Sequence, residues 1–191
     1  MTNNLQSKVP SRWDIIHDRL LQECRVWDLR ERRYRNSSSS KEGDFYYIDS
    51  RDWVIVLART VSGEFILVRQ FRCGVNDLSW ELPGGIIEKN EDPVVAALRE
   101  LKEETGYVAQ NGSVIGRCRP NPAILNNFCH FVFVEDAILG VSGTDWDEHE
   151  EIEVRVLPEK TVLKWANDCK IGHALAINAL FFYQPYKSSW N

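Results

Sequence analysis

The sequence predicts an α/β protein in which a mixed sheet is covered by helices on both faces. Two apolar strand patterns, 53–60 and 64–71, are separated by a three-residue segment that contains Gly63, as in a β-hairpin. An amphipathic helix is expected over 93–104. Strand and helix patterns do not alternate one for one along the chain, so a mixed sheet is favoured over a doubly wound parallel sheet.

The first part of the chain predicts an extension ahead of the main domain. Apolar residues recur at helical spacing between Pro10 and Cys24, which predicts a helix over 10–24. The patterns of 25–34 and 44–49 predict an antiparallel hairpin that can add to a sheet edge or reach a partner subunit. We therefore expect residues 1–44 to form an N-terminal extension and 45–191 to form the main domain.

The helix over 93–104 has signals at both ends. Asp92 is a good N-cap, Pro93 suits the first helical position, and Gly106 stands where a left-handed C-terminal cap is expected. Just before it, Pro83 ends a short strand, and Gly84 and Gly85 permit unusual backbone angles. The later elements are expected to be a strand at 129–134, an acidic loop at 145–151, a strand at 152–157, and helices near 160–168 and 172–185.

Composition narrows the class of protein. The formal net charge is −5, which argues against a nucleic-acid polymer as partner. No apolar run approaches the length of a membrane span, and the first residues lack the pattern of a secretory signal. The five cysteines are an odd number without a C-x-x-C pair, so reduced thiols are expected rather than disulfides or a zinc site. We expect a cytoplasmic protein with no membrane association.

Three carboxylates gather on one flank of the predicted helix. Glu100, Glu103 and Glu104 fall within about a third of its circumference at about 100° per residue. Like charges at this spacing repel one another, and clustered hard oxygen ligands suit Mg²⁺ or Mn²⁺. The alternative is a solvated acidic helix face, which is the commoner meaning of such a charge run.

The spacing of these residues resembles a known motif. From Gly85 the chain has five residues, Glu91, seven residues, and then Arg99-Glu100-Leu101-Lys102-Glu103-Glu104-Thr105-Gly106-Tyr107. This resembles the box of the Nudix hydrolase family, G-x5-E-x7-R-E-U-x-E-E-x-G-U with U apolar, and only Tyr107 departs mildly from it. The resemblance implies an α/β/α sandwich that hydrolyses nucleoside diphosphates linked to another group, by metal-assisted attack of water on phosphorus.

The resemblance also implies roles for the residues of the box. Glu100, Glu104 and the backbone carbonyl of Gly84 are expected to bind the metal, with Glu103 as a ligand to an additional or shared ion. Arg99 and Glu103 are placed in the catalytic set. Arg99, together with Glu91, is expected to orient the metal ligands.

Further segments resemble the branch of ADP-ribose and nucleoside-diphosphate-sugar pyrophosphatases. These are Arg69-Gln70-Phe71-Arg72, Glu81-Leu82-Pro83-Gly84-Gly85 and Pro122. In that branch the last arginine contacts the diphosphate, which suits Arg72, although a surface arginine at a strand end is the alternative. Trp53 and Gly85 are also expected at the substrate, although Trp53 can instead serve packing. The related enzymes form homodimers through their N-terminal strands, so a homodimer is expected by analogy.

The same branch has a catalytic glutamate on a late acidic loop. Glu148-His149-Glu150-Glu151 occupies the corresponding place, and Glu150 is the predicted general base. Glu148 and Glu151 compete for this role, and a solvated turn is the alternative for the whole loop.

The sequence therefore predicts a Mg²⁺- or Mn²⁺-dependent pyrophosphatase. Its substrate would be ADP-ribose or a related nucleoside-diphosphate sugar, and its products a nucleoside monophosphate and a sugar phosphate. Hydrolysis at the 5′-end of RNA is a second hypothesis, favoured only by the basic stretch 30–35. A Nudix domain that senses its ligand without catalysis is a third hypothesis.

Overall fold

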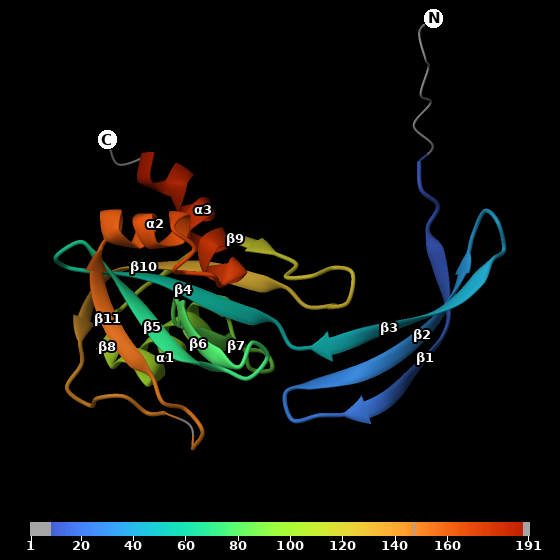
Figure 1. Cartoon of the computed structure of the whole chain (residues 1–191), viewed down its shortest axis with the longest axis horizontal. Coiled ribbons are helices and arrows are strands. Elements are labelled where there is room, and N and C mark those ends of the chain that lie inside the picture. Colours follow the sequence, from blue (N-terminus) through green and yellow to red (C-terminus); the bar gives the residue numbers. More distant parts are fainter. Residues whose placement is uncertain (1–8, 147, 189–191) are drawn as a thin grey trace, which may run out of the picture. The chain divides into compact units, whose positions relative to one another are not determined.

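The computed structural model describes residues 9–146 and 148–188, with side chains described up to residue 186. The chain forms two compact units, one up to Ser50 together with Asn121–Asn126 and the other made of Arg51–Pro120 and the residues from Asn127 onward. The expected boundary at residue 44 stays a prediction. The described elements (Figure 1) are β1 (Trp13–Glu23), β2 (Trp27–Asn36), β3 (Glu42–Ser50), β4 (Trp53–Thr60), β5 (Glu64–Arg72), β6 (Asp77–Glu81), β7 (Gly84–Ile86), α1 (Pro93–Thr105), β8 (Tyr107–Val108), β9 (Ser113–Cys118), β10 (Cys129–Leu139), β11 (Glu153–Pro158), α2 (Glu159–Asn167) and α3 (Ala174–Ser188).

The first unit is built on a three-stranded antiparallel sheet in the order β1-β2-β3. The hairpin expected from 25–34 and 44–49 is present as β2 and β3. The helix expected over 10–24 is wrong, because Trp13–Glu23 forms strand β1 along the edge of that hairpin.

The register of β1 explains why its sequence resembles a helix. The pairing of β1 with β2 shifts between Ile15 and His17 and again between Leu20 and Gln22. Each shift inserts an extra residue and so breaks the period-2 alternation that marks a strand. The apolar residues consequently fall at spacings of three and four, as on a helix face.

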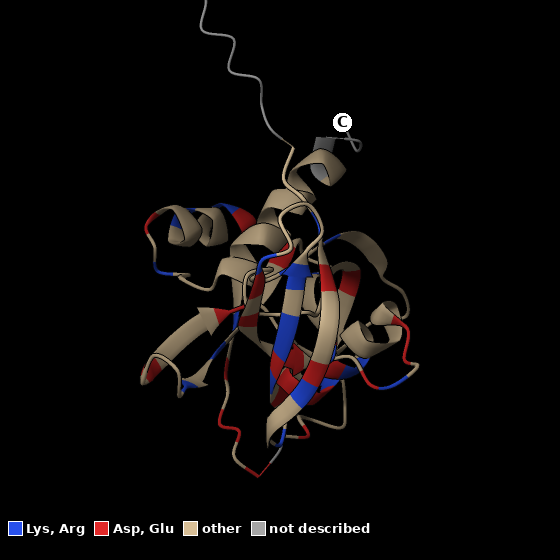
Figure 2. Ribbon diagram, turned by 90° about the vertical axis from the view of Figure 1, so that its right-hand side faces the viewer, with Lys and Arg blue, Asp and Glu red and all other residues tan. Residues whose placement is uncertain are grey.

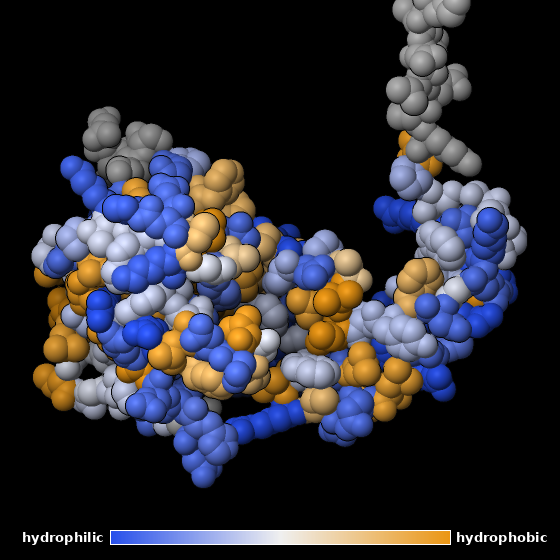
Figure 3. Space-filling view, viewed as in Figure 1, coloured by the Kyte–Doolittle hydropathy of each residue, from blue (hydrophilic) through white to orange (hydrophobic). Residues whose placement is uncertain are grey.

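Side-chain pairs across the strands stabilise this sheet. Asp18 on β1 accepts hydrogen bonds from Arg30 and Arg32 on β2 and from Tyr47 on β3. Acidic and basic residues alternate across its strands (Figure 2). Apolar side chains also remain exposed on it, including Trp13, Ile15, Leu20 and Phe45, and Figure 3 shows such side chains at its surface. The partners of these ion pairs lie on different strands and are far apart in the sequence. No local sequence pattern could therefore predict them.

The second unit contains a mixed sheet, as predicted. Its main path runs β11-β5-β4-β10-β8, with β6 on β5, β7 on β4 and β9 on β10. The pair β4 and β10 is parallel and the other pairs are antiparallel. The two long central strands, β4 and β10, are almost wholly buried along the residues that pair.

Helices cover both faces of this sheet, which confirms the predicted fold class (Figure 1). On one face α1 buries Ala96, Ala97 and Leu101 against alternate residues of the central strands. On the other face α2 and α3 pack on a larger core that includes Phe65 and Phe131. Opposite faces of one strand serve the two cores because successive strand side chains point to opposite sides.

Two further predictions can be compared with the structure. All five cysteines are free thiols. Among the residues that the structure describes, no helix has the length and apolar character needed to cross a membrane.

Candidate active site

Helix α1 and its two flanking loops position the acidic residues of the site. Asp92 caps the helix through a 2.8 Å hydrogen bond from the Val94 amide to its carboxylate, and Gly106 ends it with φ of 73°. Both ends are as the sequence predicts. Because Ala97 and Leu101 anchor one face in the core, Glu100 and Glu104 are turned toward the sheet.

Glu104 is a buried carboxylate beneath the loop that contains the two glycines. It is only 4% exposed, and its oxygens accept hydrogen bonds from the Gly84 amide at 3.0 Å and from Gln70 Nε2 at 3.4 Å. Burial raises its pKa from 4.5 to about 8, and the nearby charges of Glu100 and Glu150 act in the same direction. A buried carboxylate with so few hydrogen bonds is costly unless a cation joins it.

The pKa of Glu100 is raised for the same reason. Burial raises its pKa from 4.5 to about 7, although the adjacent Arg99 guanidinium opposes the shift. Its side chain is 13% exposed, whereas that of Glu103 is 36% exposed. The alternative of a solvated acidic helix face therefore does not hold for Glu100 and Glu104 and holds only partly for Glu103.

Arg99 binds the other acidic residues of the box. Its guanidinium donates to both oxygens of Glu91 at 2.9 and 3.1 Å, and its Nη1 donates to one oxygen each of Glu100 and Glu103 at 2.9 Å. It also donates to the carbonyl of Ile86 at 3.1 Å. One arginine thus ties helix α1 to the preceding loop and fixes the orientation of three carboxylates.

These residues suit a divalent cation. Glu104 is buried and Glu100 is mostly buried, and their carboxylates repel one another. The Arg99 guanidinium binds Glu100, whereas the Gly84 amide and Gln70 bind Glu104. Carboxylate and carbonyl oxygens are the ligands that Mg²⁺ and Mn²⁺ prefer. The residues that would hold such an ion are Glu100, Glu103, Glu104 and the carbonyl of Gly84.

The two glycines of β7 are required by space. Neither has a positive φ, so the unusual backbone angles that glycine permits are not what these two positions need. A Cβ on Gly84 would lie 2.2 Å from the carbonyl oxygen of Val54, and one on Gly85 would lie 2.3 Å from Glu100 Oε1. The chain there passes close to a neighbouring strand and to the predicted metal ligands, and only glycine fits.

The two alanine variants of these glycines should differ in their main effect. Gly84→Ala places a methyl group against rigid backbone, so we expect a loss of about 3 kcal/mol in the free energy of unfolding. Gly85→Ala displaces the movable end of Glu100, so we expect a loss of less than about 1 kcal/mol but a fall in kcat of about tenfold or more. Urea unfolding and steady-state kinetics measure the two quantities. Equal loss of stability in both variants would contradict this assignment.

A pocket of about 290 Å³ adjoins these glycines. Trp53, Arg72 and Gly85, the three residues expected at the substrate, all line it. The other lining residues include His173, which directly precedes α3, and Leu175 in the first turn of that helix. The pocket therefore presents an aromatic ring, a guanidinium and close-lying backbone, which are the groups that bind a nucleotide and its phosphates.

Arg72 is held by a buried acid. Its Nε and Nη2 donate to the two oxygens of Glu81 at 2.9 and 2.8 Å, and His173 Nδ1 lies 3.0 Å from Glu81 Oε2. Burial alone would raise the pKa of Glu81, but the contacts with Arg72 and His173 outweigh it and lower that pKa from 4.5 to about 2. Glu81 therefore stays ionised at neutral pH.

This lowered pKa predicts an acid-dependent loss of stability. The contribution of Glu81 is fully present above pH 4.5 and is lost as the pH falls toward 2. Its size is on the order of 2 kcal/mol, because Arg72 is partly exposed and solvent screens the pair. In urea unfolding, wild type should therefore exceed Glu81→Gln in stability at pH 7, with a difference that shrinks by pH 3. A difference that is independent of pH would contradict the role of this carboxylate.

The acidic loop is tied to the end of α1. Trp146 Nε1 donates to the Glu104 carbonyl at 3.0 Å, and the Asp145 amide donates to the Glu103 carbonyl at 2.9 Å. These bonds satisfy carbonyls that a helix end leaves without partners. Further along the loop, the charge of Glu150 raises the pKa of Glu100, Glu104 and Arg72. The choice of Glu150 over Glu148 and Glu151 as the general base stays a prediction.

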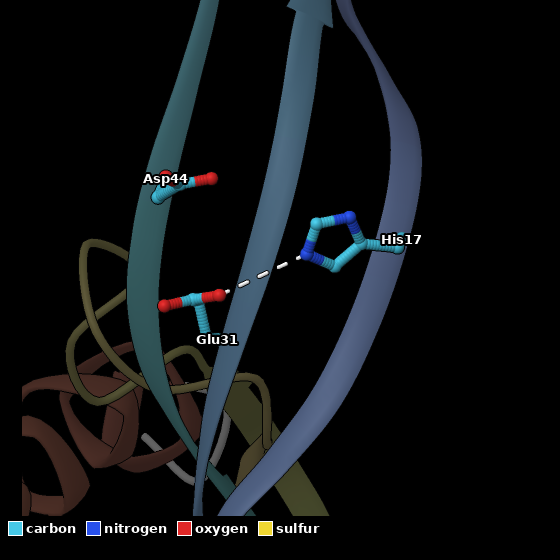
Figure 4. A group of neighbouring side chains, drawn as sticks. All are labelled: His17, Glu31 and Asp44. Atoms are coloured by element: carbon cyan, nitrogen blue, oxygen red, sulfur yellow. Dashed lines mark ion pairs between the residues drawn. The ribbon is translucent and has the colours of Figure 1, made fainter.

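A second group of metal-type ligands lies in the three-stranded sheet. His17, Glu31 and Asp44 come from β1, β2 and β3, and their ligand atoms lie within 4.8 Å of one another (Figure 4). Arg19 already holds both oxygens of Glu31 at 2.8 and 3.1 Å, and Arg33 holds both of Asp44 at 3.0 and 3.1 Å. Since a cation would have to displace two arginines, this group is best explained as cross-strand pairing.

Sequence reasoning missed several residues of the site. Gln70 and Glu81 lie within segments already recognised, and their burial at 7% and 2% shows that they have partners inside the protein. Trp146 and His173 gave no local signal, because each acts through a contact with a residue far away in the chain.

Comparison with known proteins agrees with this geometry. Residues 49–173 match the NUDIX domain family. Over 131 residues the chain is 33% identical to the ADP-ribose pyrophosphatase of Bacillus subtilis (strain 168), an alignment that spans 69% of this chain and 71% of that protein. Over 117 residues it is 36% identical to the ADP-sugar pyrophosphatase of Mus musculus, covering 59% of this chain and 48% of that protein.

A solved structure shows the same fold. The crystal structure of an ADP compounds hydrolase superposes with a TM-score of 0.84 at 19% sequence identity, and covers 97% of this chain and 99% of that one. The domain match over 49–173 includes the glutamates of α1, the acidic loop and most residues that line the pocket. The chain therefore belongs to the Nudix family.

Proposed function

We propose that this protein hydrolyses the diphosphate bond of ADP-ribose or a related nucleoside-diphosphate sugar. The observation that supports it most is the pair of carboxylates with raised pKa, the buried Glu104 and the mostly buried Glu100, next to a pocket lined by Arg72. The relatives named as ADP-ribose and ADP-sugar pyrophosphatases support the same substrate class. The products would be a nucleoside monophosphate and a sugar phosphate.

The metal in this proposal is Mg²⁺ or Mn²⁺. Glu100, Glu103, Glu104 and the Gly84 carbonyl would hold it, and it would supply Lewis-acid stabilisation of the charge that develops on the phosphate oxygens. Arg99 keeps three of the surrounding carboxylates oriented, as its hydrogen bonds to Glu91, Glu100 and Glu103 indicate.

The residues of the chain divide the remaining work. Arg72 binds the diphosphate through its guanidinium, Trp53 stacks on the base, and Gly85 lets the substrate approach the backbone. Glu150 takes a proton from the attacking water while the water oxygen bonds to phosphorus and the bridging P–O bond breaks. The leaving phosphate takes the electrons of that bond.

Hydrolysis of RNA ends is less well supported by the structure. The basic stretch 30–35 was its main argument, yet these arginines are paired within their own sheet. Arg30 and Arg32 bind Asp18, and Arg33 and Arg35 bind Glu42. Arginines already neutralised by carboxylates contribute little to phosphate binding.

We also propose that the protein is a homodimer that uses the three-stranded sheet. The apolar side chains exposed on that sheet, such as Ile15, Leu20 and Phe45, support this, because solvent-exposed clusters of this kind mark interfaces. Sedimentation at micromolar concentration should give twice the mass of the chain, and a clean monomer would remove the proposal. A cytoplasmic location fits the five free cysteines.

The proposed substrate class can be tested with a panel of nucleotides. Phosphate released by alkaline phosphatase from the products should appear with Mg²⁺ and ADP-ribose, ADP-glucose, GDP-mannose or UDP-glucose. NADH and capped RNA complete the panel. Turnover of capped RNA alone would replace the proposal with the RNA hypothesis, and no turnover at all by folded protein with metal would favour a sensing domain.

A further inference from the structure

The Glu81 carboxylate joins two elements that are far apart in the chain. It lies at the end of β6, is 2% exposed, and receives Arg72 from the end of β5 on one side. On the other side it meets His173, whose Nδ1 lies 3.0 Å from Oε2. This contact is a close approach of the imidazole to the carboxylate and not a well-aligned hydrogen bond, because the buried Nδ1 of His173 has no hydrogen-bond partner among the described residues.

This arrangement restricts the Arg72 guanidinium. Two of its nitrogens are occupied by Glu81, which fixes the plane of the group and leaves Nη1 for another anion. Arg72 also lines the pocket beside Gly84 and Gly85. A guanidinium of fixed orientation loses less rotational freedom when a diphosphate binds.

His173 is well suited to hold Glu81 in place. The preceding Ile171 is 1% exposed in the core, and the His173 carbonyl accepts the Ile177 amide at 3.1 Å in the first turn of α3. The backbone of His173 is therefore anchored independently of β5 and β6. Its ring also lines the same pocket as Arg72.

We propose that His173 is a positioning residue for diphosphate binding, which holds Glu81 so that Glu81 presents Arg72 to the substrate. This inference rests on the proposed function, because it assigns Arg72 to the substrate diphosphate. The chain of contacts runs from α3 through β6 to β5 and ends at the pocket. His173 has no direct part in the chemical step.

Three variants separate positioning from simple destabilisation. His173→Ala removes the imidazole that lies against Glu81, and we expect KM for ADP-ribose to rise about tenfold with kcat changed less than about threefold. His173→Asn can place an amide nitrogen near the position of Nδ1, so it should restore most of the affinity. Leu180→Ala, a buried position of the same helix, should lower the melting temperature without raising KM.

A double-mutant cycle tests whether His173 acts through Glu81. The KM of the double variant His173→Ala with Glu81→Gln should match that of Glu81→Gln alone, because the residue through which His173 acts is already neutral. The inference would be overturned if the rise in KM of the double variant equalled the product of the rises in the two single variants. In NMR, the imidazole signals of His173 should shift between wild type and Glu81→Gln, which checks the contact without any activity measurement.

Turnover of ADP-ribose and binding of ADP test the proposed function and this inference separately. If wild type shows no turnover of ADP-ribose, the proposed function fails, and ADP with Mg²⁺ in calorimetry then serves as the diphosphate probe. Weaker ADP binding by His173→Ala, by about tenfold, would still support positioning. Unchanged KM and ADP affinity in His173→Ala, or no binding of either nucleotide by wild type, would overturn the inference.

Discussion

Replacement of Glu104 by glutamine is expected to lower kcat by about a hundredfold or more while the protein stays folded. The change removes an anionic oxygen from the predicted metal ligands without removing volume. The Gly84 amide, 3.0 Å from the carboxylate, can still donate to the amide oxygen of glutamine. Because burial raises the pKa of Glu104 to about 8, this side chain is largely neutral at pH 7 without metal, so a neutral amide of the same size should not lower the melting temperature.

The experiment measures how activity depends on Mg²⁺ concentration and includes a matched control variant. The Mg²⁺ concentration for half-maximal activity should rise in Glu104→Gln, which separates loss of a ligand from loss of a base. Glu88→Gln is the control, because that side chain is 63% exposed and pairs with the exposed Arg51. Unchanged kcat in Glu104→Gln would remove Glu104 from the metal site.

Replacement of Glu150 by glutamine should give a different pattern. We expect kcat to fall about a hundredfold to ten-thousandfold, as on removal of a general base. KM for substrate and the Mg²⁺ requirement should stay close to those of wild type. The reason is that the charge of Glu150 raises the pKa of Glu100, Glu104 and Arg72, whereas the proposed metal ligands and Arg72 themselves are unchanged in this variant.

The neighbouring acids provide the controls for this experiment. Glu148 and Glu151 belong to the same loop and are exposed, as Glu150 is. Their glutamine variants should retain kcat within about threefold, because a base must lie within hydrogen-bond reach of the attacking water. A larger loss in either of them than in Glu150→Gln would move the base to that residue.

Local signals explain which features could be predicted from the sequence. Helix α1 was predictable to within a residue, because Asp92, Pro93 and Gly106 each have a strong positional preference. The strands β4 and β5 were predictable because their residues are apolar and a glycine turn joins them. The glutamates of the box follow from spacing alone, since the helix itself brings them together.

Other features depend on contacts between distant residues. Strand β1 was mistaken for a helix because two register shifts against β2 disguise its alternation, and only the partner strand reveals them. A side chain at position 84 would collide with the backbone of Val54, and one at position 85 would collide with Glu100. Neither contact can be predicted from the local sequence. His173 is separated from Glu81 by most of the domain sequence, so no pattern around either residue could indicate their contact.

The irregular β1 strand has a consequence for association with other chains. A three-stranded sheet has two edges, and a regular edge offers unpaired amides and carbonyls to any extended segment that comes near. In β1 the two bulges interrupt that series. On β3 the Ile48 amide is already bonded to the Ile124 carbonyl at 2.8 Å. Strand addition, and the aggregation that can follow from it, is therefore hindered at both edges, and side-chain faces are left as the surfaces available for pairing.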